Sequence, residues 1–267
     1  MVKGLYTAYT GMVQEQRRLD VLANNLANST TVGYKREGAT SKSFRDELAL
    51  RIKDSERRGV RGIGDIQMGV KIGETYTDYS DGAAKVTDEQ ADLAIQGEGF
   101  FAIEFMDKNQ NPSVKYTRNG EFNVDKDGYL VTADGDHLLN QEAAMAGSTE
   151  ENGFVRVDPM LPFFVDESGA VFQNEQQIGT IGLVDFEDYD YLTKYGENLF
   201  DLEEGGEPAQ AAGGKIVQGH LETANVNIAY EMVNMIQIQR AYEAGQKMIQ
   251  TEDSTLEMAI GQVGSVS

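Results

Sequence analysis

The sequence predicts an α+β protein with a long α-helix at each end, a central all-β domain, and an extended arm between the first helix and that domain. Apolar residues recur every seven positions near both termini, which keeps them on one stripe of a helix that faces a partner. Between the ends, short alternations of apolar and polar residues separated by turns are typical of strands. The two terminal helices are therefore expected to pair as a coiled-coil-like layer.

The N-terminal helix is expected from about Lys3 to about Asn28, within a first segment of residues 1–34. Its stripe consists of residues seven apart and of neighbours three residues further on: Leu5, Ala8, Met12, Leu19, Leu22 and Leu26. The helix should end where residues 28–33 supply poor helix formers and a glycine that tolerates positive φ.

Three asparagines, Asn24, Asn25 and Asn28, lie beside this stripe. One interpretation is a polar helix end that frays in water. The other is that their side chains form hydrogen bonds and fix the register against another helix, as a buried asparagine does in coiled coils. The sequence leaves both interpretations open.

Residues 35–74 should hold a short helix followed by the extended arm. Phe44, Leu48 and Ile52 recur at four-residue spacing, which predicts a helix from Ser43 to about Ser55. Glycines then occur at positions 59, 62, 64, 69 and 73. That density is unsuited to regular helix and indicates the arm.

Residues 75–221 should form the central β domain. Phe101, Ile103 and Phe105 alternate with other residues, as the positions on one face of a strand do. Residues 121–124 and 129–132 flank the sequence Asp125-Lys126-Asp127-Gly128. A turn of this kind between two alternating stretches predicts a hairpin.

The C-terminal helix is expected within residues 222–267, with Asn225 or Asn227 as its N-cap. Neither terminal helix has room for a core of its own, so both stripes should be buried against each other and against another surface. The candidate assembly interface joins the two stripes, the asparagines and Met232: Leu5, Met12, Leu19, Leu22, Asn24, Asn25, Leu26, Asn28, Ile228, Met232, Met235, Tyr242, Ile249 and Leu256.

Composition excludes several classes of function. The net charge of −21 argues against nucleic acid as a partner, because phosphate binding needs the opposite sign. There is no cysteine, which excludes disulfides and thiol chemistry. No apolar stretch is long enough to span a membrane, and the N-terminus lacks the apolar region of a cleavable secretory signal.

No catalytic constellation stands out, so the protein is expected to be neither an enzyme nor dependent on a cofactor. His137 and His220 lie far apart in the sequence, and each is more easily explained as a surface or satisfied core residue than as a base or ligand. No metal site is predicted at either of them.

One segment nearly fits a calcium-binding loop. Asn123, Asp125 and Asp127 precede Gly128, and Asp134 follows six residues later, close to the template of such loops. The flanking residues alternate as strands do, however, whereas the template is flanked by helices. An Asp-Gly hairpin turn accounts for the same residues.

Several motifs, in order along nearly the whole chain, resemble the bacterial flagellar rod and hook protein family. They are LDVLANNLAN (residues 19–28) with GYK (33–35), DLAIQGEGFF (92–101), YTRNGEF (116–122), GYLVT (128–132), GHLETANVN (219–227) and EMVNMIQIQRAYE (231–243). The stretch between Tyr34-Lys35 and Gly69 is about as long as the corresponding arm of the distal rod protein, the member that this chain resembles most.

The resemblance implies a structural subunit of the flagellar basal-body rod. Its terminal helices would form the inner layer of a hollow helical filament of identical copies, with the β domain outside, and the shaft would carry motor torque to the hook. The resemblance also implies contact with other rod and hook proteins, and export through the flagellar apparatus without a cleaved signal. Two alternatives stay open: a proximal rod or hook-junction member of the same family, and an acidic calcium-binding β-domain protein.

Overall fold

The computed structural model describes residues 2–43, 47–51, 61–66, 69–108, 111–196, 198–203, 205–206 and 212–264. The chain divides into two compact units. Unit 1 comprises Met1–Ala27, Glu37–Asp78 and Asn227–Ser267, and unit 2 comprises Asn28–Arg36 and Tyr79–Val226. Each unit is thus assembled from segments that are far apart in the sequence.

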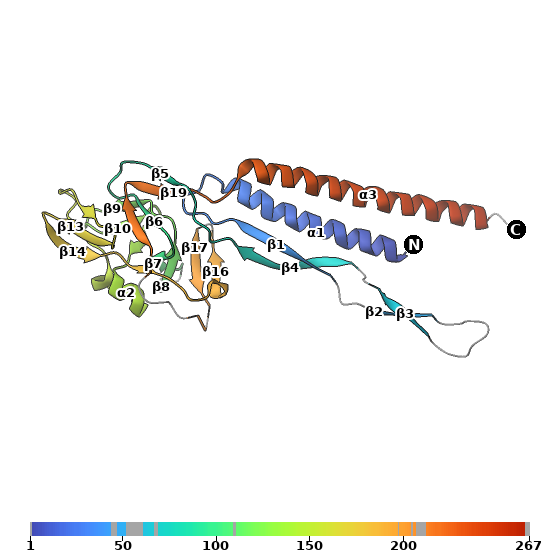
Figure 1. The fold of residues 1–267 in the computed structure, drawn as a ribbon, viewed down its shortest axis with the longest axis horizontal. Coiled ribbons are helices and arrows are strands. Elements are labelled where there is room, and N and C mark those ends of the chain that lie inside the picture. The colour runs from blue at the N-terminus through green and yellow to red at the C-terminus, as the bar shows by residue number, and fades with distance from the viewer. Residues whose placement is uncertain are drawn as a thin grey trace. The chain divides into compact units, whose positions relative to one another are not determined.

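Unit 1 contains the two long helices, α1 (Val2–Ala27) and α3 (Ile228–Gly264). They lie side by side and run in opposite directions (Figure 1). The helices predicted at the two ends are therefore confirmed. The side chain of Asn227 accepts a hydrogen bond from the backbone N–H of Tyr230 at 3.1 Å, which makes Asn227, rather than Asn225, the N-cap of α3.

The rest of unit 1 consists of two antiparallel strand pairs. β1 (Glu37–Ser43) pairs with β4 (Val70–Thr77), and both contact α1. β2 (Glu47–Arg51) pairs with β3 (Arg61–Ile66). α1 therefore has α3 on one side and the β1–β4 pair on another.

The short helix predicted from Ser43 to Ser55 is wrong. Leu48 lies in strand β2, whose backbone pairs with β3, and Phe44 and Ile52 lie outside the described residues. Three apolar residues at a spacing of four are a weak signal, because a short apolar segment suits a strand equally well. Strand pairing with β3, which the local spacing does not reveal, decides the outcome.

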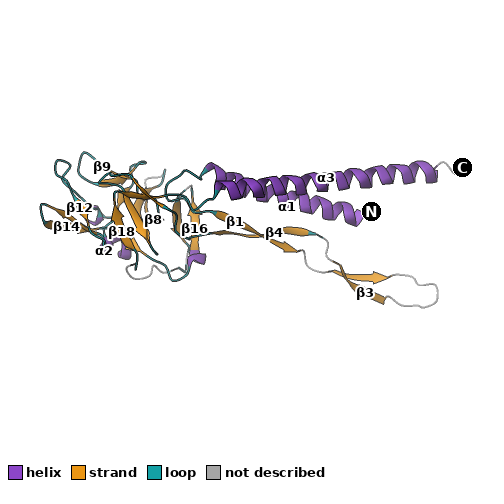
Figure 2. Ribbon diagram, turned by 45° about the horizontal axis from the view of Figure 1, so that its top comes forward, coloured by secondary structure: helices purple, strands orange, loops and turns teal. Residues whose placement is uncertain are grey.

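Unit 2 is built on an eight-stranded sheet (Figure 2) with the order β16-β17-β8-β7-β11-β10-β9 and with β15 also paired to β7. Its strands are β7 (Phe100–Met106), β8 (Pro112–Thr117), β9 (Phe122–Val124), β10 (Leu130–Thr132), β11 (His137–Leu138), β15 (Leu183–Val184), β16 (Leu192–Tyr195) and β17 (Leu199–Leu202). The hairpin predicted around Asp125–Gly128 is confirmed as the β9–β10 pair.

Smaller sheets complete unit 2. Their strands are β5 (Ala84–Val86), which pairs with β19 (His220–Glu222), β6 (Leu93–Gln96), which pairs with β18 (Lys215–Gln218), and the three-stranded set β12 (Phe164–Val165), β13 (Ala170–Gln173) and β14 (Gln176–Thr180). The unit is not all-β as predicted, because it also holds a short helix, α2 (Gln141–Ala146). Asn140 caps the start of α2 and Gly147, at φ +62°, ends it.

Two apolar clusters form the core of unit 2, and β7 contributes to both. Phe101 and Ile103 belong to one cluster, and Phe100 and Ala102 to the other. Successive side chains of a strand point to opposite faces of the sheet, so β7 is covered on both faces. The alternation read from Phe101, Ile103 and Phe105 captured only one of these faces.

The two units differ sharply in how much apolar surface they bury. Among the described residues, Ile238 is the one buried hydrophobic residue that belongs to unit 1, and all the others belong to unit 2. None of the described helices combines the length and apolar character needed to cross a bilayer. Unit 1, two long helices with two strand pairs, therefore buries few hydrophobic side chains among those that the structure describes.

Candidate functional site

The residues predicted for the assembly interface have unequal exposure in unit 1. Seven are half-buried: Met12, Leu19, Leu22, Leu26, Met235, Ile249 and Leu256. Five are exposed: Leu5, Asn24, Ile228, Met232 and Tyr242. Asn25 is buried, and Asn28, which belongs to unit 2, is half-buried.

A second stripe of α3 is covered as well, and sequence analysis missed it. Its members also repeat every seven residues: Glu231, Ile238, Gly245, Glu252 and Ala259. The helices approach closely along this stripe, because a Cβ at Gly245 would lie 2.7 Å from Cγ of Met12. This repeat was not predicted, because four of its five members are glutamate, glycine or alanine rather than large apolar residues.

The buried Asn25 fixes the start of β1. Its Nδ2 donates to the carbonyl oxygen of Glu37 at 2.8 Å, and its Oδ1 accepts from the N–H of Glu37 at 2.9 Å. With 1% of its surface exposed, it is no fraying helix end. The register that it fixes is that of a strand against α1, whereas the sequence suggested a helix as the partner.

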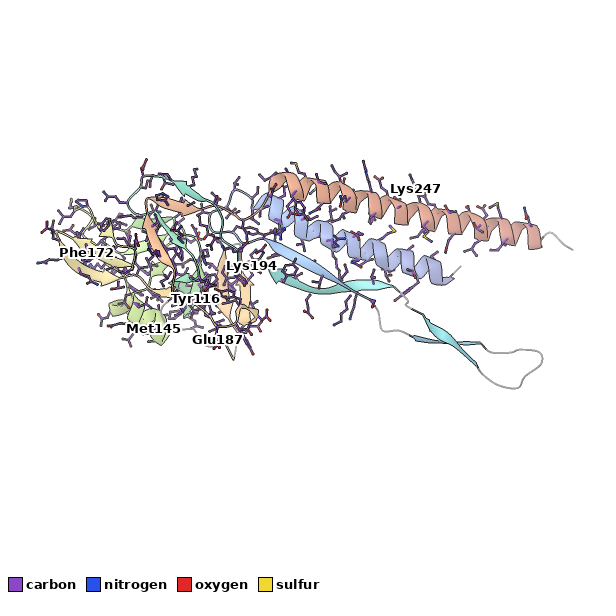
Figure 3. All side chains as sticks on the ribbon, in the orientation of Figure 1. Tyr116, Met145, Phe172, Glu187, Lys194 and Lys247 are labelled. Carbon is purple, nitrogen blue, oxygen red and sulfur yellow. The ribbon has the colours of Figure 1, made fainter. Side chains whose placement is uncertain are left out.

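The first turns of α3 carry an exposed surface without charge, here called the α3 collar. It consists of the exposed residues of Ile228–Gln239: Ile228, Ala229, Tyr230, Met232, Val233, Ile236, Gln237 and Gln239. Further along, α3 regains charge, and Lys247 projects on the side away from α1 (Figure 3). Exposed apolar surface of this kind marks a site of interaction with another macromolecule.

A groove of about 520 Å³ runs between α1 and α3. Its lining combines apolar residues with two carboxylates: Glu15, Gln16, Leu19, Ile238, Gln239, Tyr242 and Glu243. Two members of the predicted interface, Leu19 and Tyr242, therefore face the same open space. The groove is a concave surface of the kind that can bind another group, and a neighbouring helix could occupy it.

Unit 2 holds a buried group of charges, here called the junction cluster: Lys35, Asp81, Arg118 and Glu222. Nζ of Lys35 lies 2.7 Å from Oε1 of Glu222, and Nη1 of Arg118 lies 3.3 Å from Oε2 of the same carboxylate. Arg118 also pairs with Asp81 at 3.3 Å. Lys35, Arg118 and Glu222 are each at most 3% exposed, and Asp81 lies at the half-exposed rim.

Backbone groups add further hydrogen bonds to these charges, although Nε of Arg118 is buried without a hydrogen-bond partner among the described residues. Lys35 donates to the carbonyl of Ser80 and Arg118 to that of Gly97, both at 2.8 Å. Glu222 accepts a further hydrogen bond from the N–H of Gly82 at 2.8 Å. Each buried charge therefore has an opposite charge and a backbone partner, as burial in a low dielectric requires.

Burial is the main influence on the protonation of Lys35. It lowers the pKa of the Lys35 ammonium below its ordinary value, while the negative charge of Glu222 raises it and the positive charge of Arg118 lowers it further. One cation of the cluster also has an aromatic neighbour, since the guanidinium of Arg118 lies 5.2 Å from the centre of the Phe100 ring. Outside the cluster, Nζ of Lys194 lies 3.9 Å from the centre of the Tyr34 ring. Lys35, Arg118 and Glu222 thus form a buried ionic centre, with Asp81 at its exposed rim.

Three family models match the chain. They are the Flagella basal body rod protein over residues 5–35, the Flagellar hook protein FlgE/F/G D1 domain over residues 94–174, and the Flagellar basal body rod FlgEFG protein C-terminal over residues 217–261. Together they cover both helical ends and much of unit 2.

Full-length relatives agree with these matches. The chain is 34% identical over 269 residues to the flagellar basal-body rod protein FlgG of Bacillus subtilis, covering 96% of this chain and 97% of the relative. It is 32% identical over 271 residues to FlgG of Buchnera aphidicola from Schizaphis graminum, covering 96% and 98%. The flagellar basal-body rod protein FlgF of Caulobacter vibrioides is 30% identical over 269 residues, covering 100% of both chains.

This chain belongs to the flagellar basal-body rod protein family. It is a structural subunit of the rod, located in the basal body of the flagellum, and its likeness to the distal rod protein is confirmed. The rod function holds over the alternatives that the sequence left open.

The three matched regions of this rod protein meet in the junction cluster. Lys35 ends the first region, Arg118 lies in the second, and Glu222 lies in the third. The motifs GYK, YTRNGEF and GHLETANVN carried the resemblance, yet the sequence assigned these three charged residues no role. These motifs are rich in polar residues, so a charged residue within them does not stand out in the sequence.

The remaining candidates of this rod protein have ordinary explanations. Nδ1 of His137 lies 3.1 Å from Oε2 of Glu104, and the imidazole stacks on Phe154. His220 contacts the carbonyl oxygen of Gln218 at 3.0 Å. In the described part of the chain, no group of three or more histidine, aspartate or glutamate residues is arranged to hold a metal ion.

Proposed function

We propose that this rod subunit assembles with further copies of itself through α1 and α3 into a hollow helical shaft that carries motor torque to the hook. The observation that carries this is how few hydrophobic side chains unit 1 buries: among the described residues, only Ile238 is a buried hydrophobic residue there. Helices of 26 and 37 residues with half-buried apolar stripes need neighbours to cover them.

The α3 collar and the groove supply the surfaces for these neighbours. Coiled-coil-like packing of helices from adjacent subunits would bury the collar and form a continuous inner layer. A contact between two different faces, repeated by a rotation that does not close, produces an open filament. The β-rich unit 2 would then lie outside this inner layer. Other rod and hook proteins would bind at the two ends of the filament.

The same feature suits export. Amphipathic helices without partners are marginal in water, so unit 1 of a free subunit would order fully only when it joins the rod. A weakly ordered unit 1 would pass through the flagellar export apparatus without a cleaved signal peptide. The role is structural, and we assign it no enzymatic step.

A charge on the collar tests the assembly surface. Val233 and Ile236 are about half-exposed, so Val233→Glu or Ile236→Glu leaves the interior of the subunit intact. Burial of an unpaired carboxylate between copies should weaken subunit addition by more than about tenfold. Electron microscopy of basal bodies should then show rods that stop at the level of this subunit.

Gln246→Glu is the matched control, because it places the same charge on an exposed position of α3 outside the collar. It should leave the rods complete. Full-length, rotating rods in both collar variants would refute the proposed assembly surface.

A further inference from the structure

The chain passes between units 1 and 2 at four places, and each passage lies close to the junction cluster in the sequence. The passages follow Ala27, Arg36, Asp78 and Val226. Lys35 precedes the second passage, Asp81 follows the third, and Glu222 precedes the fourth. Near the first, the N–H of Gly33 donates to the carbonyl oxygen of Glu222 at 2.9 Å.

Asn225 ties the same segments together through neutral hydrogen bonds. Its Oδ1 accepts from the N–H of Arg36 at 2.7 Å, and its Nδ2 donates to the carbonyl oxygen of Ser80 at 3.1 Å. Residues that flank the second, third and fourth passages are thereby held by one side chain. All of these residues belong to unit 2.

Burial makes the ion pairs of the junction cluster difficult to separate. A surface ion pair exchanges its partners with water at little cost. Lys35 and Glu222 are enclosed, and separating them would leave the buried Lys35 ammonium without its ion-pair partner, which is costly. The contact joins residues 187 positions apart. It therefore connects the chain beside the second passage directly with the chain beside the fourth.

We propose that the junction cluster, with Asn225, is the mechanical anchor through which load on the terminal helices enters the β-rich unit. Lys35, Arg118, Glu222 and Asn225 are positioning residues in this role. The inference rests on the proposed function, because it presumes a rod under torque. It goes further by assigning the transfer of load to buried charges rather than to the apolar seams of the helices.

The test is the response of assembled rods to load. Glu222→Gln removes the central anion and leaves Lys35 and Arg118 facing a neutral amide. We expect complete basal bodies, but a swimming speed that falls at least about twofold more steeply with rising viscosity than in the parent strain. Glu167→Gln is the matched control, since it breaks the exposed Lys215–Glu167 pair by the same substitution. It should follow the parent curve.

A second variant separates anchoring from stability. Lys35→Met combined with Glu222→Gln removes one cation together with the anion, while Arg118 keeps Asp81 and the carbonyl oxygen of Gly97. The double variant should regain the thermal stability of the purified subunit that Glu222→Gln loses. Its response to load should stay impaired. Recovery of both properties would assign the cluster to folding alone and overturn the proposal.

Asn225→Ala keeps the proposal testable if the charge variants fail to fold. In the purified subunit, amide exchange at Arg36 should rise about tenfold while β7 stays protected, and the response of the rods to load should again steepen. A parent-like response to load with Asn225→Ala would overturn the proposal. The load response is measured only on strains with complete rods. Loss of assembly in the collar variants would therefore contradict the proposed assembly surface but not the anchor.

Discussion

Gly33 shows how one residue can decide a local structure. It lies at φ +68°, just before Tyr34 and Lys35, and a Cβ there would collide with the backbone of Arg118 and Asn119. Only glycine satisfies both conditions at once, since other residues are strained at positive φ. The glycine was predicted from the sequence as a helix stop, and its contact with the YTRNGEF motif was not.

Gly33→Ala should therefore destabilise unit 2 by roughly 2–4 kcal/mol, from backbone strain together with displacement of the Arg118–Asn119 segment. Thermal or urea unfolding of the purified subunit measures the loss. Gly147→Ala is the control, because Gly147 has nearly the same φ, +62°, but nothing within 4 Å of its Cβ position. Equal losses in the two variants would mean that the close approach contributes nothing.

The residues of the junction cluster show what a single sequence cannot supply. Lys35, Arg118 and Glu222 lie in separate motifs, and no local periodicity relates them. These residues come together because of the strand pairing in unit 2. β19, which contains Glu222, pairs with β5, and β5 begins three residues after Asp81 in the sequence. Helix stripes are local and can be read from spacing, whereas contacts between distant segments follow from topology.

At the scale of elements, α1 shows two different kinds of packing. Toward α3 it presents the apolar stripe of Met12 and Leu19, which the sequence predicted. Toward the β1–β4 pair it presents polar residues, among them Gln14, whose amide contacts the Ser41 hydroxyl, and Asn25. The second face was not predicted, because polar positions on a helix are normally taken to face water.

Asn25→Ala tests this polar face. The substitution leaves the N–H and C=O of Glu37 without their partner in a buried place, so unit 1 should lose about 1–3 kcal/mol. In assembled rods, where we propose that unit 1 is fully ordered, circular dichroism during heating should show earlier loss of helix, and amide exchange at Glu37 should rise. Asn24→Ala, at the exposed neighbouring position, should have a much smaller effect. Similar effects of both would contradict the role assigned to Asn25.

Elements with a strong repeat were predicted well, and short ones were not. α1 and α3 matched their predicted bounds closely because seven-residue spacing persists over several turns. β2 was taken for a helix, and α2 was missed among strands. α2 has only six residues, and its cap at Asn140 is a better signal than its composition. For segments this short, contacts with distant parts of the chain decide whether a helix or a strand forms.

At the scale of the whole molecule, the dominant feature is the contrast in buried apolar surface between the units. Unit 2 carries two aromatic-rich clusters around β7, and unit 1 carries little that water does not reach. Free energy of unfolding follows buried apolar area. Stability should therefore be distributed unevenly along the chain.

Hydrogen exchange on the purified subunit should show this contrast. Amides in α1 and α3 should exchange at least about a hundredfold faster than those in β7 and β8, and should become protected in assembled rods. The amides of β7 serve as the internal control, because they should be protected in both states. Equal protection of helices and strands in the free subunit would contradict ordering on assembly.

The two helices of unit 1 are far apart in the sequence, and all of unit 2 is encoded between them. α1 is synthesised before unit 2, and α3, which packs against α1, is synthesised after it. A ribosome product that stops before Ile228 would fold its β-rich part but lack the helical pair and the collar. Because the proposed assembly surface needs α3, such a truncated chain is expected to stay out of the rod.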